Sequence, residues 1–278
     1  MKILLLGGSG RLGQALQNDL KKEEIDFDAP GSKELDITNK TDFQKFMQKG
    51  YTHLILTAAM TDVEKAEVFK NETLLVNSFS LENICPFCKQ EKIRLIYISS
   101  DYVFGGGKKE IGEEEKRSPV NLYGYSKMLA EILIQKSGIP YVILRLSWLF
   151  DFIGTNFFTT VEKSLFQNKV LYGNVLEMGR PTYVGDASRA TINLLDEEGI
   201  FHFGSKEGIS RFEWMVEIAN IIKKGKGLNV RIEPKSPEFF NLKAKRPLFN
   251  ILKIEKYLKK YSIPSWKDHW RFYDEKKP

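Results

Sequence analysis

Residues 2–13 read Lys-Ile-Leu-Leu-Leu-Gly-Gly-Ser-Gly-Arg-Leu-Gly, a short apolar run followed at once by glycines. The run Lys2–Leu6 is continuous, as expected for a strand that is buried on both faces of a parallel sheet. From Leu12 to Leu20, leucines recur at helical spacing. The pattern Gly7-x-x-Gly10-x-x-Gly13 lies between them, where it would let a pyrophosphate approach the helix N-terminus. The stretch therefore predicts a dinucleotide-binding strand, loop and helix, with glycines spaced differently from the usual G-x-G-x-x-G.

Strands and helices alternate through the first 150 residues. Such alternation predicts an α/β fold with a doubly wound, Rossmann-like parallel sheet, and we assign residues 1–150 to this dinucleotide-binding domain. Ligands of such sheets bind at the carboxyl ends of the strands, where the polar residues of this chain also gather. Besides 2–6, the expected strands are 26–29, 52–59, 94–99 and 141–148, and the expected helices are 71–90 and 122–136.

The regularity weakens after about residue 151, where aromatic residues and Gly/Pro breaks become frequent. We interpret residues 151–278 as a smaller C-terminal substrate-binding lobe, with about 183–204 returning to the sheet. In this half we expect a strand at 199–204 and helices at 156–166, 212–224 and 251–261, the last of these being the final helix of the chain.

The stretch Tyr123-Gly-Tyr-Ser-Lys127 carries the chemistry. On a helix, side chains four residues apart share a face, about 6 Å apart at Cβ. The Lys127 ammonium is therefore expected beside the Tyr123 phenol, where it would lower the pKa of the tyrosine. Such a tyrosine can protonate a carbonyl oxygen while hydride arrives at the carbon. Ser99-Ser100-Asp101 lies upstream and makes the combination more specific than Tyr-x-x-x-Lys alone.

Composition limits the partners that the chain can have. Its 278 residues are 42% hydrophobic, and 42 basic against 36 acidic residues give a net charge of +6. The excess suits an anionic ligand, but it is scattered, and we predict no nucleic-acid partner. No apolar run approaches the roughly 18 residues of a membrane span, so we expect no membrane contact and a cytoplasmic location. The sequence leaves room for a homodimer.

Cys85-Pro-Phe-Cys88 holds the two cysteines of the chain. This spacing is typical of a redox pair or of half a zinc site. The segment falls in the middle of an expected helix, however, and the three histidines are isolated along the chain. We therefore interpret the thiols as structural and assign no metal site.

Motifs along nearly the whole chain resemble the extended short-chain dehydrogenase/reductase superfamily, and more narrowly the dTDP-4-dehydrorhamnose reductase family. They occur in the order of that family. The matching stretches are Gly7–Gly13, Glu34–Thr38, Ala58–Glu67, Val76-Asn77, Ser99–Phe104, Tyr123–Lys127, Arg145–Trp148, Arg180–Thr182 and Arg246-Pro247.

The resemblance implies roles for individual residues. Tyr123 would donate the proton, Lys127 would hold the nicotinamide ribose, and Ser100, where the family often has threonine, would polarise the substrate carbonyl. Substrate contacts to a nucleotide-diphosphate sugar would come from Ser100, Asp101, Trp148, Asn156, Arg180 and Arg246. Cofactor contacts would come from Gly7, Ser9, Gly10, Arg11, Leu12, Gly13, Asp36, Ile37, Ala58, Ala59, Tyr123 and Lys127.

The cofactor would be NADPH, with NADH as the other candidate. In many NAD-specific relatives, an acidic residue after the second strand binds the ribose 2′-hydroxyl. Here Gly31-Ser32-Lys33 falls in that region, and Asp28 lies slightly early. A serine and a lysine would tolerate a 2′-phosphate, so we predict that NADPH is used at least as well as NADH.

The sequence departs from the family in the substrate half, at Val175–Thr182 and after Arg246-Pro247. These departures leave the identity of the sugar nucleotide open. A 4,6-dehydratase would need an Asp-Glu pair, whereas Asp101 is followed by Tyr102. The remaining alternatives are another sugar-nucleotide-modifying member of the superfamily and a non-catalytic, NADP-binding regulatory subunit like that of methionine adenosyltransferase.

Overall fold

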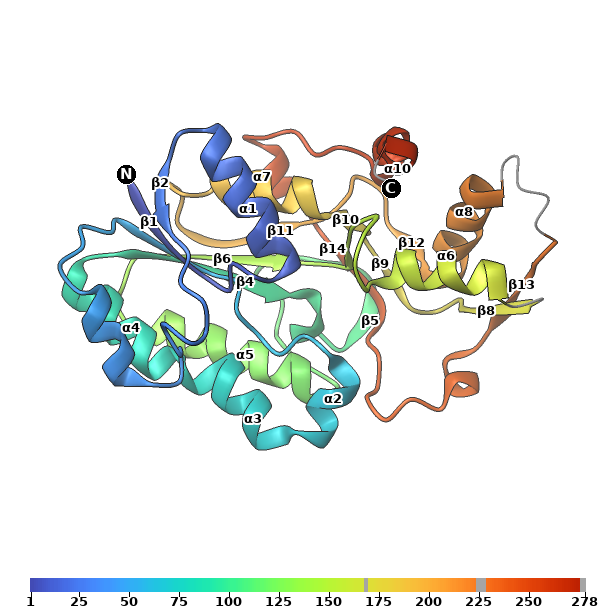
Figure 1. The fold of residues 1–278 in the computed structure, drawn as a ribbon. Helices are drawn as coiled ribbons and strands as arrows, with labels where there is room; N and C mark the ends of the chain where they lie inside the picture. Colours follow the sequence, from blue (N-terminus) through green and yellow to red (C-terminus); the bar gives the residue numbers. More distant parts are fainter. Residues whose placement is uncertain (168–169, 224–228, 276–278) are drawn as a thin grey trace.

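The computed structural model describes residues 1–167, 170–223 and 229–275, and its centre is a parallel sheet (Figure 1). The sheet has six strands in the order β11-β6-β4-β3-β1-β2, which confirms the predicted α/β fold with a doubly wound sheet. Its strands are β1 (Lys2–Leu6), β2 (Asp26–Asp28), β3 (His53–Leu56), β4 (Arg94–Ser100), β6 (Tyr141–Leu146) and β11 (Gly199–Phe203).

Helices cover both faces of the sheet because the side chains of each strand alternate between two cores. From β1, Ile3 and Leu5 enter one core and Leu4 and Leu6 enter the other. The first core lies under α1 (Arg11–Lys22) and α7 (Val184–Asn193), which Figure 1 shows side by side above the sheet. The helices below the sheet are α2 (Val63–Val68), α3 (Lys70–Leu74), α4 (Leu81–Glu91) and α5 (Leu122–Lys136). A 3-10 helix at Lys40–Phe46 adds Phe43 and Phe46 to the second core.

The strand order reverses between β1 and β3, and this is where an open α/β sheet binds its ligand. The two strand ends touch each other there, because the Thr57 hydroxyl after β3 donates to the Gly7 carbonyl oxygen after β1 at 3.1 Å. The fold thus places the glycine-rich loop at the topological switch point.

A second lobe adjoins the carboxyl ends of the strands and has an aromatic core of its own. Trp214, Phe150 and Phe158 are completely buried in it. Its helices are α6 (Phe157–Gln167), α8 (Arg211–Lys223) and α10 (Arg271–Glu275), and α9 (Glu255–Leu258) packs on β11 of the main sheet. Paired short strands join them: β7 (Leu149–Phe150) with β10 (Thr182–Tyr183), β8 (Val170–Asn174) with β13 (Arg231–Lys235), β9 (Met178–Gly179) with β12 (Ile209–Ser210), and β5 (Gly106–Ile111) with β14 (Leu248–Leu252).

The helix predicted at 251–261 is wrong. Ile251 and Leu252 belong to β14, the helix α9 has only four residues, and α10 follows it. Leu248–Leu252 pairs with β5, and this long-range partner cannot be read from local spacing. The predicted helix 71–90 is present but is interrupted by a π-helical turn at Leu75–Phe79. In the described ranges, none of the helices is long and apolar enough to cross a membrane.

Candidate active site

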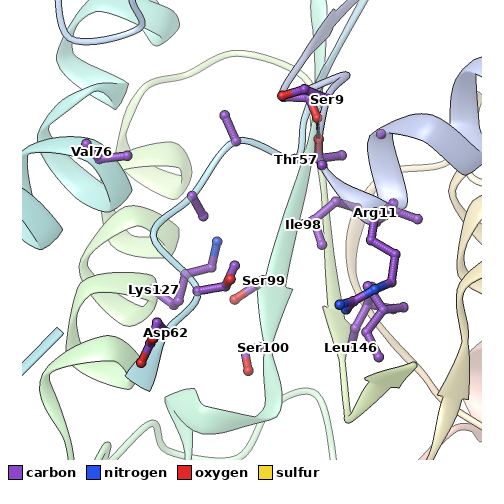
Figure 2. Close-up of a pocket in the computed structure, with 18 of the residues that line it drawn as sticks. Ser9, Arg11, Thr57, Asp62, Val76, Ile98, Ser99, Ser100, Lys127 and Leu146 are labelled. Carbon is purple, nitrogen blue, oxygen red and sulfur yellow. Dashed lines mark hydrogen bonds between the residues drawn. The ribbon is translucent and has the colours of Figure 1, made fainter. Parts of the chain in front are cut away.

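A cleft of about 860 Å³ runs along the carboxyl ends of the strands, between the sheet and the second lobe. Figure 2 shows Ser9 and Thr57 toward the top of the view, Lys127 and Ser100 below them, and Arg11 on the side of Leu146. Every residue proposed for the cofactor lines this cleft. Of those proposed for the substrate, Ser100, Asp101, Trp148 and Asn156 also line it, whereas Arg180 and Arg246 do not.

The glycine-rich loop packs so closely against its surroundings that side chains at Gly7 and Gly13 would collide with backbone atoms. Gly7 has φ of +94°, and a Cβ added there would lie 2.4 Å from the Ala58 nitrogen. A Cβ at Gly13 would lie 2.2 Å from the Gly7 carbonyl oxygen. Because the loop leads into the N-terminus of α1, it offers backbone N–H groups to an anion at close range. The position of the loop at the start of α1 therefore fits the pyrophosphate of a dinucleotide.

The region after β2 forms the rest of the predicted cofactor half. Pro30, Gly31 and Ser32 line the cleft, together with Asp36 and Ile37. The Asp36 carboxylate accepts hydrogen bonds from the Thr38 backbone N–H at 2.9 Å and from its hydroxyl at 2.8 Å, which fixes this turn.

Asp28 does not line the cleft. Its carboxylate accepts a hydrogen bond from the Tyr51 hydroxyl and lies 3.5 Å from the Lys2 ammonium. The acidic residue that could have bound a ribose 2′-hydroxyl is thus engaged elsewhere, which fits a cofactor that carries a 2′-phosphate.

Three polar side chains, Ser100, Asp101 and Ser147, meet where β4 and β6 end. The Ser100 hydroxyl donates to Asp101 Oδ1 at 3.0 Å, and the Ser147 hydroxyl donates to Asp101 Oδ2 at 2.9 Å. Burial raises the pKa of Asp101 to about 7, against the lowering effect of these two hydrogen bonds. Tyr123 lies beside this group, and its hydrogen bond with Ser100 stabilises the phenolate.

Helix α5 holds Tyr123 in position through its N-terminus. The Asn121 side chain caps the helix by accepting from the Gly124 backbone N–H at 2.8 Å. A side chain at Gly124 would collide with the Tyr102 carbonyl oxygen, 2.0 Å from the added Cβ, so the helix start packs closely against the segment after β4. The Tyr102 ring contacts the Tyr123 ring edge-on, with centroids 5.8 Å apart.

Lys127 lies one turn further along α5 and is 3% exposed. Its ammonium lies 4.2 Å from the centre of the Tyr97 ring, and within the described residues it makes no hydrogen bond or ion pair. Burial lowers the pKa of Lys127 to about 7, although the Glu131 carboxylate raises it in part. An unpartnered donor at the cleft wall fits the hydroxyls of a nicotinamide ribose.

The expectation that Lys127 lowers the pKa of Tyr123 is wrong in this structure. Burial raises the pKa of the Tyr123 phenol to about 12, Ser100 lowers it through a hydrogen bond, and the Asp101 charge raises it. The neighbour that favours the phenolate is therefore Ser100 rather than the lysine.

Trp148 and Asn156 line the part of the cleft nearest the second lobe. Trp148 has φ of +46° and stacks on Trp214, with ring centroids 5.7 Å apart. The Asn156 amide nitrogen donates to the Asp151 carbonyl oxygen at 2.9 Å, and its oxygen accepts from the Phe158 N–H at 3.0 Å. Asn156 thus fixes the start of α6 as well as bordering the cleft.

Arg180 and Arg246 are engaged in the protein itself. Buried Arg180 donates to three backbone carbonyl oxygens, at 2.7 Å to Leu252, 3.0 Å to Ser205 and 2.7 Å to Lys206. Arg246 pairs with Glu64 at 2.8 Å. The Arg180 guanidinium thus joins segments of the fold, and neither arginine lines the cleft with the other proposed substrate contacts.

Arg11, which is predicted as a cofactor contact, also donates through its guanidinium to the Thr155 carbonyl oxygen across the cleft.

Three further residues of the cleft are not identified by the sequence. Arg211, Phe157 and Trp214 form an aromatic and cationic wall of the second lobe. No local motif marks these three residues, and the packing of α6 against α8 brings Phe157 to the other two, which share α8.

Cys85 and Cys88 lie on α4 in the core below the sheet, away from the cleft. Burial raises the pKa of both thiols, to about 11 for Cys85. A raised pKa disfavours the thiolate, so these cysteines are poorly suited to redox chemistry. The described ranges hold no cluster of three metal-ligating side chains.

Comparison with known proteins gives a match over nearly the whole chain. Residues 1–274 match the family model described as the RmlD substrate binding domain. Among curated proteins, the spore coat polysaccharide biosynthesis protein SpsK of Bacillus subtilis is 29% identical over 258 residues, covering 90% of this chain and 88% of that protein. The dTDP-4-dehydrorhamnose reductase of Escherichia coli is 26% identical and covers 96% of this chain and 94% of that enzyme.

Solved structures agree with these matches. A dTDP-4-dehydrorhamnose reductase of Clostridium acetobutylicum superposes with a TM-score of 0.91 at 29% identity, over 99% of both chains. Another, from Bacillus anthracis and solved in complex with NADP, gives a TM-score of 0.90 at 28% identity, again over 99% of both chains.

Proposed function

The chain belongs to the RmlD substrate binding domain family, and we propose that it uses NADPH to reduce the C4 keto group of a nucleotide-activated 4-keto-6-deoxy sugar. The observation that carries this proposal is the meeting of Tyr123, Ser100 and Lys127 in the cleft that the glycine loop opens. Similar enzymes named dTDP-4-dehydrorhamnose reductase support a dTDP-linked sugar as the substrate.

The cofactor half of the cleft would hold NADPH, in keeping with the Bacillus anthracis relative, which was solved in complex with NADP. The glycine loop would bind its pyrophosphate, and Asp36 and Ile37 would flank its adenosine. Ala58 and Ala59 would line it beyond β3, and the Lys127 ammonium would bind the nicotinamide ribose. When bound, the cofactor supplies the hydride for carbon C4 of the sugar.

Tyr123 would supply the proton that the sugar oxygen needs. Its raised pKa keeps the phenol protonated at neutral pH, ready to donate. Ser100 would donate a hydrogen bond to the same carbonyl oxygen and so stabilise the negative charge that develops there. Because a hydroxyl has a single proton, Ser100 would release the hydrogen bond that it donates to Asp101 at 3.0 Å in order to donate to the sugar.

The alternatives have less support. A non-catalytic regulatory subunit would not need Ser100, Tyr123 and Lys127 together at one cleft. A dehydratase would need a second carboxylate beside Asp101, and Tyr102 occupies that position. A relative named for spore coat polysaccharide biosynthesis supports a role in making deoxysugar precursors. The homodimer and the cytoplasmic location stay predictions.

The test is NADPH oxidation by the purified protein against dTDP-, GDP-, UDP- and CDP-linked 4-keto-6-deoxy sugars, with NADPH binding measured separately by fluorescence. We expect turnover with the dTDP-linked substrate and little with the others. A protein that binds NADPH but turns over none of the four sugars would contradict the reductase and favour the regulatory subunit.

A further inference from the structure

Three cationic side chains line the cleft: Arg11, Lys127 and Arg211. Arg11 is part of the glycine loop and donates to the Thr155 carbonyl oxygen, and Lys127 lies in the predicted cofactor half. Arg211 begins α8 and comes from the second lobe. It is thus the cleft-lining cation that belongs to the substrate side of the described structure.

The guanidinium of Arg211 lies among aromatic rings. Its central carbon is 3.7 Å from the centre of the Trp148 ring, 4.5 Å from that of Phe157 and 5.6 Å from that of Trp214. A guanidinium stacked in this way loses rotational freedom before any ligand arrives, which reduces the entropy lost on binding. The arrangement is therefore preorganised.

Glu177 fixes one edge of the same group. Arg211 Nε lies 3.1 Å from Glu177 Oε1, and the Arg211 backbone N–H donates to the Glu177 carbonyl oxygen at 2.9 Å. Within the described residues, the two terminal nitrogens of the guanidinium make no hydrogen bond. The side chain is 16% exposed and lines the cleft, so it is open to a ligand there.

The backbone at Trp148, whose ring contacts Arg211, is strained. A bulky residue with φ of +46° is a conformational outlier, and such outliers concentrate at functional sites. Gly179 allows the ring to fit, since a Cβ added there would lie 2.5 Å from the indole. The wall formed by Trp148 and Arg211 is therefore held by close packing from behind.

Electrostatics connect Arg211 to the reacting centre. Its charge favours the ionised form of Asp101, which accepts from Ser100, and of Tyr102, which contacts Tyr123. A diphosphate joined to a sugar at that centre would lie a short distance away. The planar fork of arginine matches phosphate oxygens, whereas a lysine would offer only a point charge.

We propose that Arg211 binds the diphosphate of the nucleotide-activated sugar, held in place by Trp148, Phe157 and Glu177. This inference rests on the proposed function and supplies the diphosphate contact first expected from Arg180 and Arg246. The Arg180 guanidinium donates to backbone carbonyl oxygens, and the Arg246 guanidinium donates to the Ala244 carbonyl oxygen and pairs with Glu64.

The test compares two probes, dTDP and thymidine, which differ in the diphosphate alone. In the wild-type protein, calorimetry should show tighter binding of dTDP. Arg211→Met keeps an apolar stem against the rings and removes the charge. It should weaken dTDP binding about 10- to 100-fold, as expected for a lost charge-assisted hydrogen bond. Binding of thymidine and of NADPH should change less than about two-fold.

Arg231→Met is the matched control, because Arg231 lies on β13 with its side chain 73% exposed and away from the cleft. It should bind both probes like the wild type. If Arg211→Met does not fold, Arg211→Lys keeps a charge without the fork and should still lose several-fold in dTDP affinity. The inference is overturned if the dTDP-to-thymidine preference is absent in the wild type or unchanged in the Arg211 variants.

The proposed reductase activity and the proposed diphosphate site can be contradicted independently of each other. A wild type that binds dTDP through Arg211 but reduces none of the keto sugars contradicts the reductase and supports the diphosphate site. A wild type that reduces the dTDP-linked sugar with the same KM as Arg211→Met overturns the site and supports the reductase.

Discussion

The Lys127 ammonium lies 4.2 Å from the centre of the Tyr97 ring, without a carboxylate at ion-pair distance in the described part of the chain. Burial lowers the pKa of Lys127 to about 7 in the folded protein, whereas a lysine in the unfolded chain titrates near about 10.4. Between these two values the unfolded state binds the proton more readily. The free energy of unfolding should therefore rise with pH across this window, by up to about 1.4 kcal/mol per pH unit.

Lys127→Met should remove this pH dependence, because methionine is of similar length and has no charge to desolvate. We expect the variant to melt at a higher temperature than the wild type near about pH 7, with the difference shrinking toward about pH 10. Its affinity for NADPH should fall, since the ribose contact is lost. Thermal melts across this range and NADPH titrations measure the two effects.

Lys136→Met is the control for this experiment, because Lys136 lies exposed at the end of the same helix. Its melting temperature should follow that of the wild type at every pH. An unchanged gap between Lys127→Met and the wild type across the whole range would show that the Lys127 ammonium is not destabilised by burial.

Tyr123→Phe should abolish most of the activity while leaving the fold intact. The substitution removes only the phenolic hydroxyl, and a positioned acid typically contributes about 10²- to 10⁴-fold to the rate. The affinity for NADPH should change little. Tyr125→Phe on the same helix is the control, because Tyr125 is 45% exposed, and it should keep wild-type turnover. More than about half of the activity in Tyr123→Phe would rule out Tyr123 as the proton donor.

Cofactor choice should depend on Ser32 rather than on Asp28. Ser32 lines the cleft, whereas Asp28 is bound to Tyr51 and Lys2 outside it. Ser32→Asp should lower kcat/KM for NADPH more than for NADH, because a carboxylate there would repel the 2′-phosphate. Asp28→Asn should leave the ratio of the two cofactors unchanged. A wild type that strongly prefers NADH would contradict this assignment.

How far the sequence predicted the site depended on the range of the interactions involved. The glycine loop and the Tyr123–Lys127 helix are local features, in which spacing alone determines which groups meet. Arg180 and Arg211 are both arginines of the second lobe, yet one is engaged with backbone carbonyl oxygens and the other lines the cleft. Which of them reaches the cleft depends on how β14, α6 and α8 pack, and these are long-range contacts that no local pattern carries.

The spacing of residues along the sequence also could not predict the pKa shifts in the site. The four-residue separation correctly put Lys127 on the same helix as Tyr123, but the pKa of each group is set mainly by burial. Burial of Lys127 depends in part on Tyr97 from the neighbouring strand β4. Sequence patterns therefore identified Tyr123 and Lys127 as site residues but predicted a lowered pKa for Tyr123, whereas burial raises it.

Trp148 is expected from the sequence as a substrate contact, and the structure places it both at the cleft and in the aromatic core of the second lobe. It lines the cleft, stacks on Trp214 and is 9% exposed. Trp148→Ala should therefore raise KM for the sugar nucleotide and also lower the free energy of unfolding, by about 3 kcal/mol for a large buried aromatic residue. Urea unfolding and steady-state kinetics on the same preparation measure the two effects.

The positive φ of Trp148 makes a sharper prediction possible. Glycine adopts the left-handed region without strain, whereas alanine there is disfavoured by about 1–2 kcal/mol. Trp148→Gly should therefore be at least as stable as Trp148→Ala. Trp214 provides the control, because it lies inside α8, where glycine is about 1 kcal/mol less favourable than alanine. Urea unfolding should rank glycine above alanine at position 148 and below it at position 214. The same order at both positions would show that the Trp148 backbone is not strained, and that its ring is held against Arg211 by packing alone.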